Sequence, residues 1–366
     1  MARIEFDHVT KRFGETLAVN DATVTIEHNE FFCFFGPPSS GKSTLLRLLL
    51  GLDTPDSGEI RIDGRRVNEL APAARNLAMV FQNLALFPHM TARENVAFPL
   101  VERHMAAPII AQKLAKLAET LHISHILDKR PALLSGGERQ RVAIGRALIR
   151  DAAGYLMDDP ISALDARLRE ETRVELKRLQ GDMGHTLIYV THDQEEAMSV
   201  ADRMAVLQDG AIRQIDAPQT LYARPRTRYV AALVGSPRMN FVPGLIDPES
   251  HVFQSEQSGW RVPLSPRADL AGTGVELGFR PEHVTIAKSG DATALAARVV
   301  SVEPLGAMTV LVLEAGGGTV KAALRGQHSF GVGERVALAV PAARCIVFDA
   351  SGRAHYSADR FAETAV

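Results

Sequence analysis

A short run of glycine, lysine and hydroxyl residues near the amino terminus has the spacing of a phosphate-binding loop. The run is Gly36, Pro37, Pro38, Ser39, Ser40, Gly41, Lys42, Ser43, and Thr44 follows it. It fits the pattern of a glycine, four residues of any type, and then Gly-Lys-Ser or Gly-Lys-Thr. Backbone amides of such a loop face phosphate oxygens, Lys42 would reach the β- and γ-phosphates, and the Ser43 hydroxyl would ligate Mg²⁺. The loop therefore predicts a site for a nucleoside triphosphate and magnesium.

Two adjacent acidic residues, Asp158 and Asp159, follow the short apolar run Tyr155–Met157. If that run is a buried parallel strand, the carboxylates lie at its carboxyl end, where open sheets bind ligands. Asp158 would then hold Mg²⁺ through water, and Asp159 would face the water that attacks the phosphate. Alone, such a pair is more typical of a loop or a helix cap. Together with the phosphate loop, it favours a hydrolytic nucleotide site.

The first half of the chain alternates between strand and helix patterns that could position these residues. Strand patterns lie at Ile4–Val9 (an edge-strand pattern), Ala22–Ile26, Phe31–Phe35, Gly58–Ile62, Ala78–Phe81, Tyr155–Met157 and Thr186–Val190, with a hairpin over Arg203–Gln214 turning at Asp209-Gly210. Helical periodicity follows Lys42 and recurs over residues 107–122. This order predicts an α/β domain with a parallel sheet.

The pattern changes after about Gly235, where helical periodicity becomes scarce. Short β-type runs separated by glycine and proline turns take its place, at Val242–Ile246, Val275–Phe279, Ala296–Val302, Thr309–Leu313, Arg335–Val340 and Cys345–Phe348. Such a succession predicts a small β-barrel or sandwich. The stretch Ala217–Ser236 is the expected linker between the two parts.

The composition is that of an ordinary globular protein with more than one domain. Of the 366 residues, 46% are hydrophobic and 23% are charged, which excludes wholesale disorder. The net charge of −2 gives no global reason to bind DNA or RNA, so we expect no nucleic acid partner. With Cys33 and Cys345 as the only cysteines, a reducing, cytoplasmic compartment is favoured over a disulfide framework or a zinc site.

We expect any membrane role to act through a partner. Met1–Glu30 has no apolar core of a secretory signal. No stretch of the sequence approaches the roughly 18 uninterrupted apolar residues that a membrane helix needs.

The octet Leu134–Arg141, which reads Leu-Ser-Gly-Gly-Glu-Arg-Gln-Arg, indicates a family. In isolation a Ser-Gly-Gly turn would merely cap a helix. Between the phosphate loop and the acidic pair, however, the octet resembles the signature of ABC transporter ATPases. The resemblance implies that Ser135, Gly136, Gly137 and Glu138 contact an ATP molecule held by a second subunit.

Other residues match landmarks of that family in the same order along the chain. Phe13 matches an aromatic residue that stacks on adenine, and Gln82 matches the Q-loop glutamine, which contacts the nucleotide and Mg²⁺. The tetrapeptide Ser162-Ala163-Leu164-Asp165 matches the D-loop, which assigns Asp165 to the nucleotide site. His192 matches the switch histidine, which acts in catalysis with Asp159.

The resemblance extends into the second half of the chain. Gly235–Phe241 and Phe279–Val284 look like the accessory β domain of carbohydrate-importer ATPases, such as those of maltose and glycerol-3-phosphate importers. The implied fold is an α/β P-loop ATPase domain at residues 1–235, with a helical subdomain at about 86–150. An all-β, OB/TOBE-like barrel domain follows at residues 236–366.

The family also implies partners. Two ATPase subunits sandwich two ATP molecules, so this chain needs a second ATPase subunit, either a second copy or a different chain. Two membrane permease subunits receive the closing motion, and a solute-binding protein acts through them. The chain would therefore lie peripherally at the cytoplasmic face of the membrane. Asn83–Pro88 is where relatives receive a permease helix, although core packing explains its apolar character equally well.

The expected cargo is a sugar, a polyol or a related phosphate or sulfonate ester. Importers of inorganic anions, iron or polyamines share the layout and stay open as an alternative. A regulatory ATPase without a transport role is a second alternative. A chromosome-maintenance ATPase is disfavoured, because no sustained heptads lie between Ser43 and Ser135.

Two positions depart from the family pattern. Asp159 stands where these ATPases usually carry glutamate, which withdraws the carboxylate by one methylene, about 1.3–1.5 Å. Displacements of that order can lower a rate about 100-fold, so we expect reduced hydrolysis. Ser39 stands where glycine is common, and Pro38 stiffens the same turn. ATP binding should survive, and a heterodimer with a subunit that carries the glutamate becomes a possibility.

Overall fold

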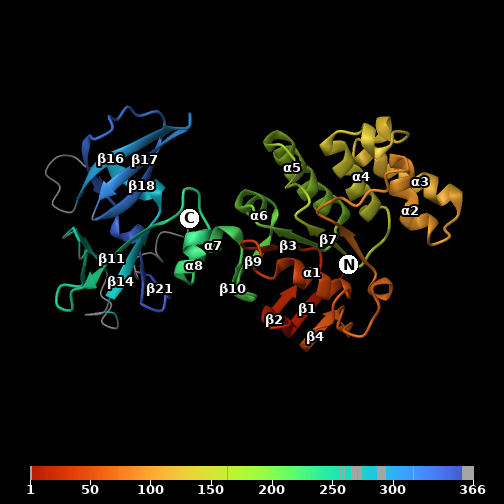
Figure 1. The fold of residues 1–366 in the computed structure, drawn as a ribbon, viewed down its shortest axis with the longest axis horizontal. Helices are drawn as coiled ribbons and strands as arrows, with labels where there is room; N and C mark the ends of the chain where they lie inside the picture. The colour runs from red at the N-terminus through yellow and green to blue at the C-terminus, as the bar shows by residue number, and fades with distance from the viewer. Residues whose placement is uncertain are drawn as a thin grey trace. The chain divides into compact units, whose positions relative to one another are not determined.

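The computed structural model of the protein describes residues 2–162, 164–255, 257–258, 260–264, 270, 274–286, 294–315 and 317–356 (Figure 1). Contacts divide the chain into two units, residues 1–220 and 221–366. The division falls inside the expected linker and earlier than the expected boundary between residues 235 and 236.

The first unit is built on a six-stranded sheet whose strand order is β10-β9-β3-β8-β7-β6. The strands are β3 (Phe31–Phe35), β6 (Leu77–Val80), β7 (Gly154–Asp158), β8 (Leu187–Thr191), β9 (Arg203–Gln208) and β10 (Ala211–Asp216). All neighbours pair in parallel except β9 and β10, which form the expected antiparallel hairpin. Asp209 and Gly210 turn it with φ values of 49° and 78°, as a tight hairpin turn requires. The predicted parallel α/β sheet is confirmed.

A second, antiparallel sheet in this unit has the strand order β2-β1-β4-β5. Its strands are β1 (Ile4–Phe13), β2 (Thr16–Ile26), β4 (Ser57–Ile62) and β5 (Arg65–Arg66). Because β1 pairs with both β2 and β4, the expectation of an edge strand at Ile4–Val9 is wrong. Its alternation arises because one face of the sheet is buried and the other solvated, and a central strand shows the same pattern.

The main core of this unit joins the two sheets and the first helix, α1 (Lys42–Leu50). Leu45, Leu48 and Leu49 of α1 are fully buried in one cluster with residues of β1 and β3. At the end of α1, the buried Arg75 guanidinium donates to the carbonyls of Leu48 and Leu49 at 2.7 and 2.8 Å. These bonds fix the carboxyl end of the helix that carries Lys42 and Ser43.

The remaining helices of this unit are α2 (Ala92–Val101), α3 (Ala107–Thr120), α4 (Gly136–Leu148), α5 (Ala166–Met183) and α6 (Gln194–Val200). Figure 1 shows α2, α3 and α4 gathered at one end of the unit, and all three lie within residues 86–150. The helix expected at 107–122 corresponds to α3. In the described part of the chain no helix is long and apolar enough to span a bilayer.

The second unit is rich in β structure, as predicted. One sheet has the order β13-β12-β11-β14-β20-β21 and the other the order β15-β19-β16-β17-β18. The strands are β11 (Asn240–Ile246), β12 (Val252–Ser255), β13 (Arg261–Pro263), β14 (Gly274–Phe279), β15 (Thr285–Ile286), β16 (Leu295–Pro304), β17 (Met308–Ala315), β18 (Gly318–Arg325), β19 (Arg335–Ala339), β20 (Ile346–Phe348) and β21 (Ala354–His355). A cluster that includes Trp260, Phe279 and Leu311 forms its core.

The expected linker is partly helical, with α7 (Pro218–Ala223) and α8 (Arg228–Leu233). The buried Arg280 guanidinium is one of the contacts that join most of this stretch to the second unit. It donates to the carbonyls of Tyr222 at 2.8 Å and Ala231 at 3.2 Å, and also to that of Val234. The sequence predicted a linker here and did not reveal these contacts, because they come from Arg280, a residue far away in the sequence.

Candidate active site

The phosphate loop connects the end of β3 to the start of α1, as its sequence pattern requires. A Cβ atom on Gly36 would lie 2.7 Å from the Leu207 carbonyl oxygen, and one on Gly41 would lie 2.4 Å from that of Ala18. Only glycine fits at either position. Ser39 has a φ of 62°, a left-handed conformation that explains why glycine is common at this point of the loop.

Lys42 points its ammonium group back into the loop. Its Nζ donates to the carbonyls of Gly36 at 2.9 Å and Pro37 at 2.7 Å, and the side chain is buried. Burial lowers the pKa of Lys42, while the charges of Asp159 and Asp158 oppose that shift. The amides of residues 42–44 precede the first hydrogen bond of α1, so they are available at its positive end.

Ser43 and Asp158 come together at the carboxyl edge of the parallel sheet. The Ser43 hydroxyl donates to Asp158 Oδ1 at 3.1 Å. Burial raises the pKa of Asp158, and the hydrogen bond from Ser43 opposes the rise. Gln82 is exposed and leaves β6 at the same edge, because Val80 pairs with Met157 in parallel register. Hydroxyl, carboxylate and amide oxygens are the ligand types that Mg²⁺ prefers.

Asp159 is the next residue after β7 and contacts the end of β8. Its Oδ2 lies 2.9 Å from His192 Nδ1, and its Oδ1 lies 3.3 Å from Thr191 Oγ1. Asp159 is buried with a φ of 47°, whereas half of the His192 side chain is exposed. The structure thus joins the two residues that the sequence predicted as catalytic.

A buried acidic residue behind this pair, Glu196 of α6, was not predicted from the sequence. It accepts hydrogen bonds from the hydroxyls of Tyr189 at 2.9 Å and Thr191 at 2.8 Å. Burial raises the pKa of Glu196. Thr191 therefore connects Glu196 to Asp159. Within the sequence Glu196 belongs to a polar run and Thr191 ends an apolar one, so neither carries a signal of its own.

The signature residues form a helix start of their own. Ser135 caps α4: its Oγ accepts from the Glu138 amide at 3.3 Å, and the Glu138 carboxylate accepts from the Ser135 amide at 2.7 Å. That backbone hydrogen bond lowers the pKa of Glu138. A Cβ on Gly137 would lie 3.3 Å from the Leu168 side chain. Gly136 and Gly137 therefore form the first turn of α4.

Two other predicted residues lie at element boundaries. Asp165 caps α5 by accepting from the Leu168 amide at 3.0 Å, while Ala163 of the same tetrapeptide lies outside the described residues. Phe13 ends β1 with 47% of its surface exposed, and Lys11 Nζ lies 5.3 Å from its ring centroid. An exposed ring braced by a cation can stack against a planar ligand.

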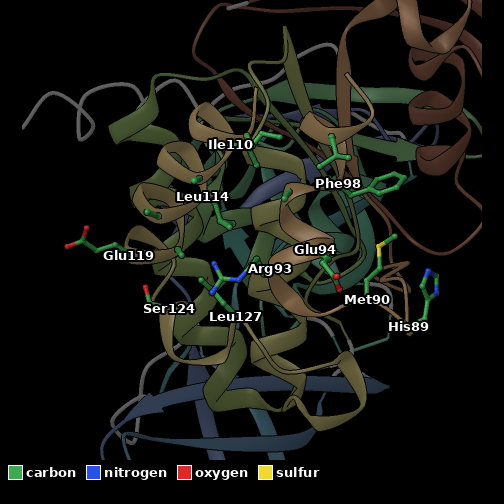
Figure 2. Close-up of a pocket in the computed structure, with 16 residues that line it drawn as sticks. His89, Met90, Arg93, Glu94, Phe98, Ile110, Leu114, Glu119, Ser124 and Leu127 are labelled. Atoms are coloured by element: carbon green, nitrogen blue, oxygen red, sulfur yellow. The ribbon is translucent and has the colours of Figure 1, made fainter. Parts of the chain in front are cut away.

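Two apolar grooves lie on the helical part of the unit. The larger, of about 1030 Å³, opens between α2 and α3, and Figure 2 shows side chains of both helices along it, among them Arg93 of α2 and Leu114 of α3. The second, of about 540 Å³, is lined by Phe81, Ala85, Phe87 and Arg146 among others. It therefore includes part of Asn83–Pro88, the segment that the sequence singled out.

Comparison with known proteins identifies the class to which this fold and site belong. A family model described as ABC transporter matches residues 19–162, a MalK OB fold domain matches 235–284, and a TOBE domain matches 277–348. A dimeric ATP-binding cassette solved in a post-hydrolysis state with ADP and Pi is 32% identical, with a TM-score of 0.53. The match covers 58% of this chain and 98% of the chain of that cassette.

Relatives extend the similarity over nearly the whole chain. The sn-glycerol-3-phosphate import ATP-binding protein of Chromohalobacter salexigens is 44% identical over 96% of this chain and 95% of its own. The lactose transport ATP-binding protein of Rhizobium radiobacter is 39% identical over 96% of this chain and 99% of its own length. The trehalose import ATP-binding protein of Mycobacterium tuberculosis is 45% identical over 80% of this chain and 75% of its own length. The chain belongs to the ATP-binding subunits of ABC transporters.

Proposed function

We propose that this chain binds and hydrolyses ATP to power an ABC importer for a sugar, a polyol or a related phosphate or sulfonate derivative. The names of its relatives, which concern glycerol-3-phosphate, trehalose and lactose, support this class of cargo. The observation that carries the proposal is the cluster at the carboxyl edge of the parallel sheet. There a buried lysine, a Ser43–Asp158 pair and an Asp159–His192 pair surround the start of α1.

ATP would bind with its triphosphate along the loop and the start of α1. The loop amides and Lys42 would hold the β- and γ-phosphates, whose oxygens compete with the Gly36 and Pro37 carbonyls for the ammonium group. The exposed ring of Phe13 would stack on adenine. Because Pro37 and Pro38 carry no N–H, the phosphates would be held by the amides that follow them in the loop, from Ser39 on, and by those of residues 42–44.

Ser43, Asp158 and Gln82 would hold Mg²⁺ beside the phosphates. The observed Ser43–Asp158 bond brings two of these oxygen donors within 3.1 Å of one another, which suits a hard cation with further ligands from phosphate and water. When bound, the metal neutralises charge that develops on the phosphate oxygens.

Asp159 and His192 would carry out the hydrolytic step. Asp159 would orient the attacking water and accept its proton, while His192 would steady the carboxylate and contact the γ-phosphate. Because the aspartate is shorter than glutamate and its two oxygens already face Thr191 and His192, we propose a slow hydrolytic step.

The signature of a second subunit would complete each ATP site. Ser135 Oγ accepts from the Glu138 amide, so its own proton stays free to donate to a phosphate, together with the amides of Gly136 and Gly137. Asp165 would lie at the contact between subunits. Closing of the pair would be passed to two membrane permeases, and through them to a solute-binding protein. The chain would work peripherally at the cytoplasmic face of the membrane, with the groove at Ala85 and Phe87 receiving a permease helix.

Lys42→Ala tests the proposal. Loss of the buried ammonium group should weaken MgATP binding at least 10-fold and lower hydrolysis at least 100-fold in the purified subunit. Lys113→Ala, which removes a lysine paired with Asp151 on the surface of α3, is the control and should match the wild type. Unchanged nucleotide affinity and hydrolysis in Lys42→Ala would refute the proposal.

A further inference from the structure

The segment after Gln82 holds an unusual backbone conformation. Leu84 and Ala85 have φ values of 60° and 44°, so two consecutive residues with side chains occupy the left-handed region. Local hydrogen bonds run from the Leu84 amide to the Phe81 carbonyl at 2.8 Å and from the Ala85 amide to the Asn83 carbonyl at 2.7 Å. Left-handed backbone is unfavourable for any residue with a Cβ and persists only where the surroundings hold it.

One side chain from another element holds this turn. Arg146 donates from Nη1 to the Ala85 carbonyl at 2.6 Å and from Nη2 to the Leu84 carbonyl at 2.7 Å. Its guanidinium also lies 5.6 Å from the ring centroid of Phe87. A planar fork with two parallel donors fits two adjacent carbonyls better than a single ammonium group does.

The same arginine connects two parts of the candidate site. It belongs to the last turn of α4, whose first turn carries the signature residues after Ser135. Ser135 and Arg146 lie about 16 Å apart along this helix at about 1.5 Å per residue, so one helix connects the signature to the turn. On the other side, the turn presents Ala85 and Phe87 to the 540 Å³ groove, and Asn95 anchors Phe87 by hydrogen bonds to its amide and its carbonyl.

We propose that Arg146 is a positioning residue that holds the Leu84–Ala85 turn in its left-handed shape and thereby links the signature helix to the permease-docking groove. The role of the groove rests on the function proposed above. The part of the proposal that concerns the turn depends only on the hydrogen bonds from Arg146 to the Leu84 and Ala85 carbonyls. A shift of α4 on dimer closure would reach the groove through the two hydrogen bonds from Arg146.

A double substitution distinguishes this role from simple filling of space. In Arg146→Met the turn loses both bonds, and we expect hydrogen exchange at the Leu84 and Ala85 amides to become at least 10-fold faster. Glycine adopts a φ of 44° without the Cβ penalty, so Ala85→Gly should stabilise the turn without the arginine. Exchange in Arg146→Met/Ala85→Gly should return to within about 3-fold of the wild type.

Matched controls make the rescue specific. Ala106→Gly introduces glycine at a φ of −60° and should not rescue Arg146→Met. Arg150→Met removes a neighbouring arginine that bonds Asn76 instead, and should leave exchange at Leu84 and Ala85 unchanged. If Arg146→Met does not fold, Arg146→Lys, which keeps the charge with a single ammonium group, should show intermediate exchange that Ala85→Gly again slows.

Normal exchange in the Arg146 variants, or a double variant no slower than the single one, would overturn the proposal. Failure of the proposed function has a different signature. In that case Lys42→Ala would leave ATP binding unchanged while the rescue by Ala85→Gly still held.

Discussion

Asp159 combines a short side chain with a backbone conformation that suits it. Aspartate enters the left-handed region more readily than most residues with a Cβ, and Asp159 has a φ of 47°. Glutamate at this position would reach further but would lose that local preference. Aspartate therefore suits the left-handed backbone at this position, but its carboxylate extends less far toward the phosphate than that of glutamate would.

Asp159→Glu should make ATP hydrolysis faster and lower the free energy of unfolding. We expect hydrolysis of ATP by the purified subunit to rise roughly 10- to 100-fold, because the carboxylate regains about 1.3–1.5 Å of reach. The free energy of unfolding should fall by about 0.5–1 kcal/mol, because glutamate fits left-handed backbone less well. Steady-state kinetics and thermal unfolding measure the two effects. A variant that hydrolyses ATP no faster would contradict the idea that the missing methylene limits the rate.

At the scale of elements, one buried arginine joins α7 and α8 to the second unit. Arg280 is 2% exposed, and its guanidinium lies 4.2 Å from the ring centroid of Tyr222 as well as donating to carbonyls at the ends of α7 and α8. Gly235, with a φ of 121°, makes room for it, since a Cβ there would clash with the guanidinium.

Arg280→Met should therefore destabilise the second unit by about 3 kcal/mol, because several buried carbonyls lose their donor. Calorimetry would measure this, and ATP affinity should persist because the nucleotide residues belong to the first unit. Arg298→Met is the control, since Arg298 forms an exposed pair with Glu314, and its effect should stay below about 1 kcal/mol. Equal effects of the two substitutions would contradict the role given to Arg280.

The sequence predicted the elements whose signals are local. The phosphate loop is contiguous, and the apolar runs of the parallel sheet are short and bounded by polar residues, so both could be recognised in advance. What the sequence did not reveal depends on contacts between distant segments. Glu196 lies in a polar run, whereas Arg146 and Arg280 are single charged residues beside apolar ones. Only the fold shows what each of them contacts.

At the scale of the whole molecule, one chain carries one phosphate loop and one signature. A related cassette is dimeric in a post-hydrolysis state, which supports pairing between two subunits. In Asp159→Asn, which should bind MgATP and hydrolyse it very slowly, we expect ATP to double the mass measured by light scattering. Ser135→Arg in the same background should bind ATP and stay monomeric. A constant mass with bound ATP would instead favour pairing with a different subunit.

The inward position of Lys42 also bears on how products leave. Two carbonyl groups of its own loop already lie within hydrogen-bonding distance of the ammonium group. An incoming nucleotide must outcompete them, which makes capture weaker than the phosphate contacts alone would allow. By the same reasoning, the ammonium group can return to these two carbonyls when ADP leaves, and its charge then stays paired and buried between cycles.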